Sequence, residues 1–248
     1  MPTAVLLSGG LDSAVLVAEE AASGEVQPVY VSVGLAWEAA ERAIVSRFLA
    51  RASLDGRVRP LVSLSADMRD VYAATHWAVQ GHPPAYHTPD IDVYLPGRNV
   101  ILLGKAAVYC AAARMDRLVI GTLAHNPFPD ARPEFRAAMA RALSLGLDHP
   151  LQIDAPYANA SKADVIRRGA ALEVPFELTL SCMNPPQSAL PAQSALPTQS
   201  ALPAQSAILN PHSAMHCGAC SKCRERHDGF VEAGILDPTA YATAVNLR

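Results

Sequence analysis

The stretch TAVLLSGGLDSAVL, residues 3–16, decides the fold of this chain. It begins with TAVLLS, a β-branched and leucine-rich run of the kind that forms a strand buried on both faces. Apolar residues then repeat at helical spacing at Leu11, Ala14, Val15 and Ala18. Gly24 provides a stop for this helix. The stretch therefore predicts a strand, a glycine turn and a helix.

The turn itself, SGGLDS at residues 8–13, has the composition of a phosphate-binding loop. In open α/β sheets the first strand-to-helix turn is the usual phosphate site, because amides of the loop and of the helix start point at the anion. The two glycines allow close backbone approach, and the two serines add hydroxyl donors. A carboxylate repels phosphates unless a cation intervenes, so we assign Asp12 to organising Mg²⁺ or the loop itself. An ordinary tight turn without a ligand is the alternative.

Strand-like and helix-like patterns alternate over the first 180 residues. Strands are expected at 3–8, 26–33, 58–64 and 116–122, and helices at 11–23, 36–52, 99–115, 133–146 and 161–172. Pro133 suits a first helical turn, and Ser161 with Asp164 forms a capping-box pattern. This alternation predicts an α/β fold with a doubly wound, mostly parallel sheet.

Composition limits the classes of protein that this chain can belong to. Of its 248 residues, 50% are hydrophobic and 17% are charged, which is enough apolar material for a sizeable core. The longest apolar run, 106–113, is well short of the roughly 20 residues that a membrane helix needs. The start of the chain has no signal-peptide pattern, so we expect a cytoplasmic protein. A net charge of −3 argues against a general nucleic-acid-binding surface.

Four of the five cysteines lie in the C-terminal third, at Cys182, Cys217, Cys220 and Cys223. The last three form C-x₂-C-x₂-C, and Gly218 suits the tight turn between the first two of them. Four thiolates satisfy tetrahedral Zn²⁺ and leave no open position, which predicts a structural zinc site. An iron–sulfur cluster is the alternative. The nearby His212, His216 and His227 are substitute ligands in principle, but we interpret them as surface or surrounding groups.

These patterns divide the chain into three parts. Residues 1–180 are expected to form a nucleotide-binding α/β domain, residues 181–230 a small zinc-binding subdomain, and residues 231–248 a helical tail. Within the second part, residues 187–207 repeat a six-residue unit, QSALPA, with a proline in each copy. Proline at that spacing stops any helix before two turns. We interpret the repeat as a flexible, dispensable surface loop rather than a functional element.

SGGLDS resembles the loop of the PP-loop ATP pyrophosphatases, which release pyrophosphate and need no P-loop lysine. Further motifs are LPGRN at 95–99, PDARPEF at 129–135, SKADVI at 161–166, and the cysteines followed by RERHDGF at 224–230. In this order they resemble the 7-cyano-7-deazaguanine synthase family of queuosine precursor synthesis. The resemblance covers Val5 to about Phe230, with the repeat as an insertion.

The resemblance implies an ATP-dependent C–N ligase. ATP activates the carboxylate of 7-carboxy-7-deazaguanine, ammonia displaces the nucleotide to give an amide, and a second activation dehydrates the amide to the nitrile. It implies Mg²⁺ with ATP, structural Zn²⁺ and a homodimer. ATP is expected to contact Leu7, Ser8, Gly9, Gly10, Leu11, Asp12, Ser13, Ala14, Val15, Leu16 and Val17. The expected catalytic residues are Asp12, Ser13, Arg98 and Lys162.

Arg98 suits the carboxylate or the phosphates, because a guanidinium binds either in a bidentate manner; capping a loop through carbonyls is its alternative role. Asn99 is assigned to substrate binding, and Asp130 to accepting hydrogen bonds from the amino edge of the purine-like ring. Arg132 is assigned either to binding the anion or to forming an ion pair with Asp130 or Glu134. Lys162, at a helix start, is suited to neutralising phosphate charge; in the alternative interpretation it is a solvated lysine on a helix surface.

Two segments depart from the family pattern. The family motif DYGQRH after the second strand is replaced by residues 30–43, YVSVGLAWEAAERA, and SGYPDCR is replaced by NPFPDAR at 126–132, where Ala131 stands in place of a cysteine. Both lie where an acceptor substrate would be bound. Two other hypotheses therefore stay open: a PP-loop ligase that amidates or thiolates another small molecule, tRNA base or protein end, and a nucleotide-binding scaffold without turnover.

Overall fold

The structure is a computed structural model that describes residues 1–52, 54, 56–124, 126–186 and 214–243. The repeat at 187–207 and His212 lie outside the described residues, and so do the predictions made for them. Among the described residues, no helix is long and apolar enough to cross a membrane.

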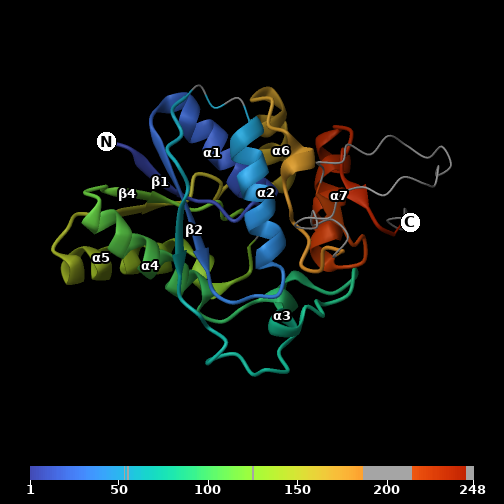
Figure 1. Cartoon of the computed structure of the whole chain (residues 1–248), viewed down its shortest axis with the longest axis horizontal. Coiled ribbons are helices and arrows are strands. Elements are labelled where there is room, and N and C mark those ends of the chain that lie inside the picture. Colours follow the sequence, from blue (N-terminus) through green and yellow to red (C-terminus); the bar gives the residue numbers. More distant parts are fainter. Residues whose placement is uncertain (53, 55, 125, 187–213, 244–248) are drawn as a thin grey trace, which may run out of the picture.

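A five-stranded parallel sheet forms the centre of the molecule (Figure 1). Its strands are β1 (Thr3–Leu6), β2 (Val26–Ser32), β3 (Val62–Ser65), β4 (Arg117–Val119) and β5 (Gln152–Asp154), in the order β3-β2-β1-β4-β5. Every neighbouring pair is parallel. This confirms the predicted α/β fold. The sequence analysis missed β5, whose three residues carry too short a pattern.

Helices cover both faces of this sheet. They are α1 (Leu11–Ser23), α2 (Glu38–Arg51), α4 (Arg98–Ala112), α5 (Pro133–Leu147) and α6 (Lys162–Ala171). Helix α4 packs on β2, β3 and β4, and α5 packs on α4 and β5. Helix α1 lies against β1 and β2 and contacts α6. In Figure 1, α4 and α5 lie together, away from α1 and α6, so the sheet is doubly wound as predicted.

The predicted helix signals are present in the structure. Ser161 is the N-cap of α6, and its side chain and that of Asp164 form the reciprocal capping box. Pro133 is in the first turn of α5, and Gly24 is the C-cap of α1. Four short helical segments complete the domain: α3 (Trp77–Gln80), η1 (Asp90–Val93), η2 (Pro129–Ala131) and η3 (Phe176–Leu178).

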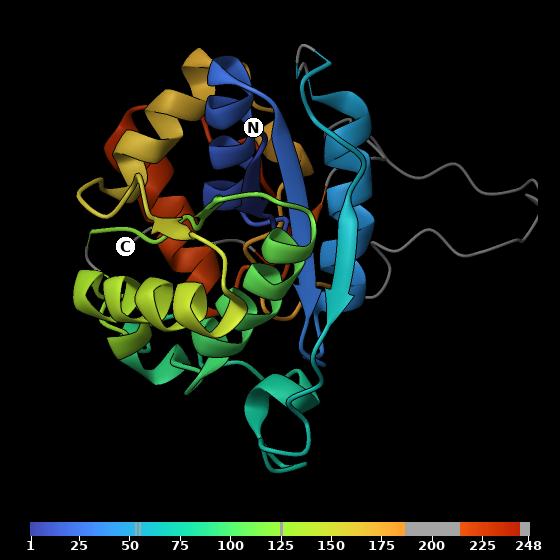
Figure 2. The same ribbon diagram turned by 90° about the vertical axis from the view of Figure 1, so that its left-hand side faces the viewer.

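The C-terminal segment contains one helix and one two-stranded sheet. Helix α7 (Ser221–Ala233) packs on α6, and β6 (Met215–His216) pairs with β7 (Ala240–Tyr241). The predicted helical tail at 231–248 is wrong over residues 234–243, because α7 ends at Ala233, with Gly234 as its left-handed C-cap, and a strand follows. Figure 2 shows α7 lying behind α6 on the side of the molecule away from β3.

A buried arginine fixes this segment to the main domain. Arg226 on α7 is 1% exposed, and its guanidinium donates to the carbonyl oxygen of Phe176 at 2.8 Å, Thr179 Oγ1 at 2.8 Å and Thr239 Oγ1 at 2.6 Å. These bonds connect α7 to η3 and to the chain after α7.

The strand order reverses between β1 and β4, so ligands are expected at the carboxyl ends of these two strands.

Candidate functional site

The glycine turn after β1 has a conformation that only glycine adopts without strain. Gly9 has φ +83°, and a Cβ atom at this position would lie 2.9 Å from Ile44 Cγ2 and 3.0 Å from Val45 Cγ2. The turn therefore requires both a left-handed backbone and the absence of a side chain. Helix α2 sits directly against the loop at this point.

The serines of the loop hold its shape. Ser13 Oγ donates to the carbonyl oxygen of Gly10 at 2.9 Å, and the Ser8 amide donates to Ser13 Oγ at 3.3 Å. The Gly10 amide donates to Ser8 Oγ, also at 3.3 Å. Gly10 is the N-cap of α1 and offers no side-chain cap, so the amides of the first turn remain available to an anion.

Three charged residues from distant parts of the chain meet beside this loop. Lys162 Nζ, in the first turn of α6, lies 2.6 Å from Asp12 Oδ2 and 2.9 Å from Glu225 Oε1 on α7. Burial alone would lower the pKa of Lys162, but the two carboxylates outweigh it and raise that pKa. Lys162 is therefore a fixed cation at the loop, rather than a solvated helix lysine.

A cavity of about 490 Å³ opens at this place. Its walls come from α1, α6, α7 and the chain after β4, including Asp12, Lys162, Gly121 and Phe128. Asp12 Oδ1 is buried and has no hydrogen-bond partner among the described residues. Buried polar atoms are normally paired, so this oxygen indicates a ligand or ion that binds here.

The other predicted substrate residues form a second cluster at the start of α4. The Asn99 amide donates to Asp130 Oδ2 at 3.1 Å, and Asn99 Nδ2 donates to Asp130 Oδ1 at 3.2 Å. Asp130 is 6% exposed, and this burial raises its pKa, against the hydrogen bonds from Asn99 and the charge of Arg98. Both oxygens of Asp130 thus already bind the helix start, which shows a positioning contact for α4.

Arg98 and Arg132 differ in their surroundings. Arg98 Nε is buried and has no hydrogen-bond partner among the described residues, and the charge of Arg98 acts on the carboxyls of Glu41 and Asp130. Arg132 is exposed, and in the described parts of the chain it forms no ion pair with Asp130 or Glu134. The buried arginine next to it in space is Arg136, which donates to the carbonyl oxygen of Ala131 at 2.5 Å.

Sequence analysis missed a pair of buried carboxylates at the carboxyl end of β2. Glu41 accepts from Tyr30 Oη at 2.9 Å and from Trp37 Nε1 at 3.0 Å, and Glu38 accepts from the Val33 amide at 2.8 Å. Burial raises the pKa of Glu41 to about 7, although the charge of Arg98 opposes this. Two glutamates in the first turn of the helix after β2 were the available signal. They occupy the place of the missing family motif.

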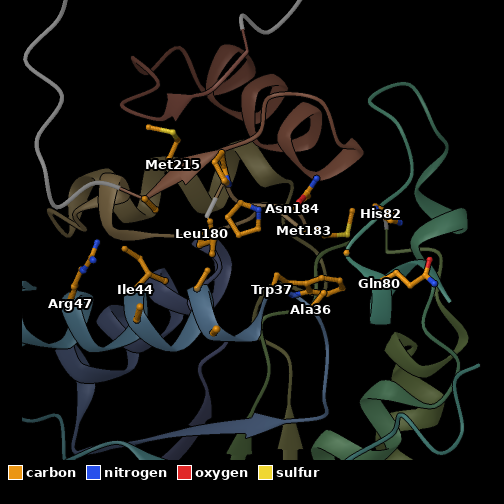
Figure 3. A pocket seen from close by; sticks show the side chains of 17 residues that line it. Ala36, Trp37, Ile44, Arg47, Gln80, His82, Leu180, Met183, Asn184 and Met215 are labelled. Atoms are coloured by element: carbon orange, nitrogen blue, oxygen red, sulfur yellow. The ribbon is translucent and has the colours of Figure 1, made fainter. Parts of the chain in front are cut away.

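A larger cavity of about 750 Å³ lies between α2 and the segment around Cys182 (Figure 3). Ile44 on α2 and Trp37 at its N-cap point into it, and Leu180 and Met183 face them from the segment around Cys182. None of the predicted ATP, catalytic or substrate residues lines it. Of these residues, Asp12 and Lys162 line the smaller cavity beside the loop.

The four predicted metal ligands meet in the structure. The sulfur atoms of Cys182, Cys217, Cys220 and Cys223 all lie within 4.8 Å of one another. Gly218 has φ +77°, and a Cβ there would collide with the carbonyl oxygen of Thr243, so the predicted glycine turn is confirmed. His216 accepts from the Ser181 amide through Nε2 at 3.1 Å and stands outside the ligand set.

These residues fit a tetrahedral thiolate site. The Cys217–Cys223 and Cys220–Cys223 sulfur pairs are 3.8 Å and 3.5 Å apart. A Zn–S bond of about 2.3 Å gives a tetrahedral S···S separation of about 3.8 Å. Backbone amides also donate to the sulfurs, for example that of Cys217 to Cys182 Sγ at 3.3 Å, which stabilises thiolate charge. The cluster can therefore hold a metal ion such as zinc.

The fold and the lysine-free glycine turn on β1 define an α/β protein of the PP-loop class. A family model described as "Queuosine biosynthesis protein QueC" matches residues 3–234. The chain belongs to the QueC family, and so to a family of enzymes.

Curated relatives agree with this assignment. A 7-cyano-7-deazaguanine synthase of Anaeromyxobacter dehalogenans is 33% identical, over 96% of this chain and 94% of the relative. Synthases of the same name from Azoarcus sp. and Thermoplasma volcanium are 32% and 31% identical, each over 96% of this chain and over 95% and 90% of the relative.

Proposed function

We propose that the protein converts 7-carboxy-7-deazaguanine and ammonia to 7-cyano-7-deazaguanine at the expense of ATP. The observation that carries this proposal is the meeting of Asp12 and Lys162 at the PP loop, beside a cavity, in a chain of the QueC family. The family supplies the reaction, and the geometry supports a site for its nucleotide.

The loop is suited to a pyrophosphate leaving group. Amides at the start of α1 and the hydroxyl of Ser8 are donors for its oxygens, Ser13 holds the loop through the Gly10 carbonyl, and Lys162 provides the positive charge. Asp12 cannot bind phosphate directly, so it holds Lys162 and, when the nucleotide brings one, Mg²⁺. The metal would neutralise phosphate charge as pyrophosphate leaves.

Arg98 is assigned to the acceptor carboxylate. Its buried and unpaired Nε makes it the cation near the end of β2 that an incoming anion would pair with. Asn99 and Asp130 fix the start of α4 and thereby the base of the Arg98 side chain. Asp130 thus acts on substrate through this positioning, and a contact of Asp130 with the purine-like amino edge remains a prediction.

The reaction balances as two successive activations. In the first, a carboxylate oxygen attacks the α-phosphorus of ATP, pyrophosphate leaves, and ammonia then displaces AMP to form the amide. In the second, the amide oxygen is adenylated in the same way, and loss of AMP and a proton leaves the nitrile.

The four-cysteine cluster is proposed to bind structural zinc, and free ammonia is proposed as the nitrogen source.

The test uses purified protein with ATP, Mg²⁺, ammonium and 7-carboxy-7-deazaguanine. We expect a nitrile product by mass spectrometry, with AMP and pyrophosphate released for each activation. Asp12→Asn should lower the rate at least about 100-fold, because it removes the negative charge that holds Lys162 and Mg²⁺, with little change of shape. AMP release with another acceptor, but none with this acid, would favour a different PP-loop ligase. No ATP consumption with any acceptor would favour the scaffold hypothesis.

A further inference from the structure

Helix α7 carries both an ionic and a steric contact to the lysine at the PP loop. Glu225 Oε1 lies 2.9 Å from Lys162 Nζ, and Glu225 Oε2 pairs with Lys222 one turn earlier. The Glu225 side chain is 22% exposed, and its two carboxylate oxygens contact two different lysines. Glu225 therefore holds the Lys162 ammonium together with Asp12.

One turn further along, α7 leaves room for the same lysine. A Cβ atom on Gly229 would collide with Lys162 Cγ and would lie 3.1 Å from Ile166 Cδ1. The aliphatic stem of Lys162 therefore runs across the helix at Gly229, and its ammonium ends between the carboxylates of Asp12 and Glu225. Two independent features of α7 thus determine where this ammonium lies.

The beginning of α7 belongs to the cysteine cluster. Cys220 is the N-cap of the helix and Cys223 lies in its first turn, two residues before Glu225. The cluster therefore contributes to the position of the helix that carries Glu225. The ion pair between Glu225 and Lys162 then links the cluster to Asp12 of the PP loop.

We propose that Glu225 is a positioning residue, which holds the Lys162 ammonium at the PP loop and so makes catalysis depend on the cysteine cluster. The inference rests on the proposed function, because it assigns Lys162 to the phosphates. It makes a specific kinetic prediction. A carboxylate beside an anion site opposes anion binding, so Glu225 assists turnover through Lys162 and not through affinity for ATP.

The test compares Glu225→Gln with Glu173→Gln, a control at an exposed glutamate that follows α6 and does not line the cavity beside the loop. We expect Glu225→Gln to lower kcat about tenfold, the effect of one lost charge-assisted contact to the lysine, while the KM for ATP stays equal or falls. Zinc content and thermal midpoint should match those of the control. An unchanged kcat, a raised KM, or loss of zinc in parallel with activity would each overturn the proposal.

A second variant changes the position of the Lys162 side chain without changing the charge around it. Gly229→Ala should displace the stem of Lys162 and also lower kcat, so full activity in this variant would contradict the proposed path of the side chain. Calorimetry with inorganic pyrophosphate gives a readout that needs no turnover. Glu225→Gln should bind it at least as tightly as wild type, and weaker binding would overturn the inference. If wild-type protein releases no AMP with any acceptor, the proposed function fails, and this binding measurement still tests Glu225.

Discussion

The backbone amide of Leu180 donates to the carbonyl oxygen of Gly9 at 2.7 Å. This bond joins the segment that leads to Cys182 directly to the PP loop. The ion pair between Lys162 and Glu225 adds a second connection, because Lys162 also contacts Asp12 of the loop. The cysteine-containing part of the chain is therefore connected to the PP loop both directly and through Lys162.

Loss of one cysteine ligand should affect both the metal content and the stability of the protein. Cys220→Ser removes one thiolate, and we expect loss of zinc together with a decrease of about 3 kcal/mol or more in the free energy of unfolding. Metal analysis and urea denaturation measure the two effects. Cys110→Ala is the control, because Cys110 is a buried thiol far from the cluster in sequence and outside its ligand set. It should keep its zinc; retention of zinc by Cys220→Ser would contradict the assignment.

Gly9→Ala should deform the PP loop. The new methyl group would lie 2.9 Å from Ile44 Cγ2 at a backbone φ of +83°, so strain and collision act together. We expect a loss of about 1–3 kcal/mol of stability and of measurable ATP binding in calorimetry. Gly10→Ala is the stability control, since its Cβ would meet only Ser8 Oγ, at 3.4 Å, and Leu180 O, at 3.8 Å. Equal stability of the two variants would show that the left-handed turn is not required.

Arg98→Lys should separate acid binding from ATP binding. Lysine keeps the positive charge but loses the forked geometry that pairs with a carboxylate. We expect the KM for the acceptor acid to rise about tenfold or more, with little change in the KM for ATP. Steady-state kinetics with each substrate varied in turn measures both. A rise in the KM for ATP alone would indicate that Arg98 binds the phosphates and not the acceptor acid.

Glu41 should give the protein a pH dependence near neutrality. Burial raises the pKa of its carboxyl from 4.5 to about 7, so the folded state binds this proton more tightly than the unfolded state does. The corresponding stabilisation is present at pH below about 4.5 and is lost as pH rises towards 7. The difference in unfolding free energy between wild type and Glu41→Gln should fall by about 1–3 kcal/mol between these pH values. A difference that is constant with pH, in urea titrations, would show that Glu41 is already ionised.

Much of this architecture could be predicted from local sequence. Strand β1, the glycine turn and α1 have short-range signals that agree with one another, and the four cysteines have a chemistry that only a shared site explains. The capping box at Ser161 and the turn at Gly218 also appear where the sequence places them. Such features depend on neighbours along the chain or on one strong chemical requirement.

Other features depend on contacts that local sequence does not encode. Strand β5 has three residues, and its pairing with β4 defines it more than its own pattern does. In the sequence Glu225 is indistinguishable from any charged residue on a helix surface, and only the packing of α6 on α7 places it beside Lys162. The contact of Asp130 with substrate stays a prediction, and local sequence did not show that this η2 carboxylate accepts hydrogen bonds from Asn99 at the start of α4. Which partner a polar residue finds is decided by packing of elements distant in sequence.

The chain has two tryptophans in all, and Trp37 and Trp77 stack on each other with ring centroids 5.8 Å apart and planes 10° apart. Intrinsic fluorescence of the protein therefore originates from one place, where α2 meets α3. A ligand that shifts α2 would alter this emission directly, so occupancy of the neighbouring loop becomes readable in solution without any attached dye.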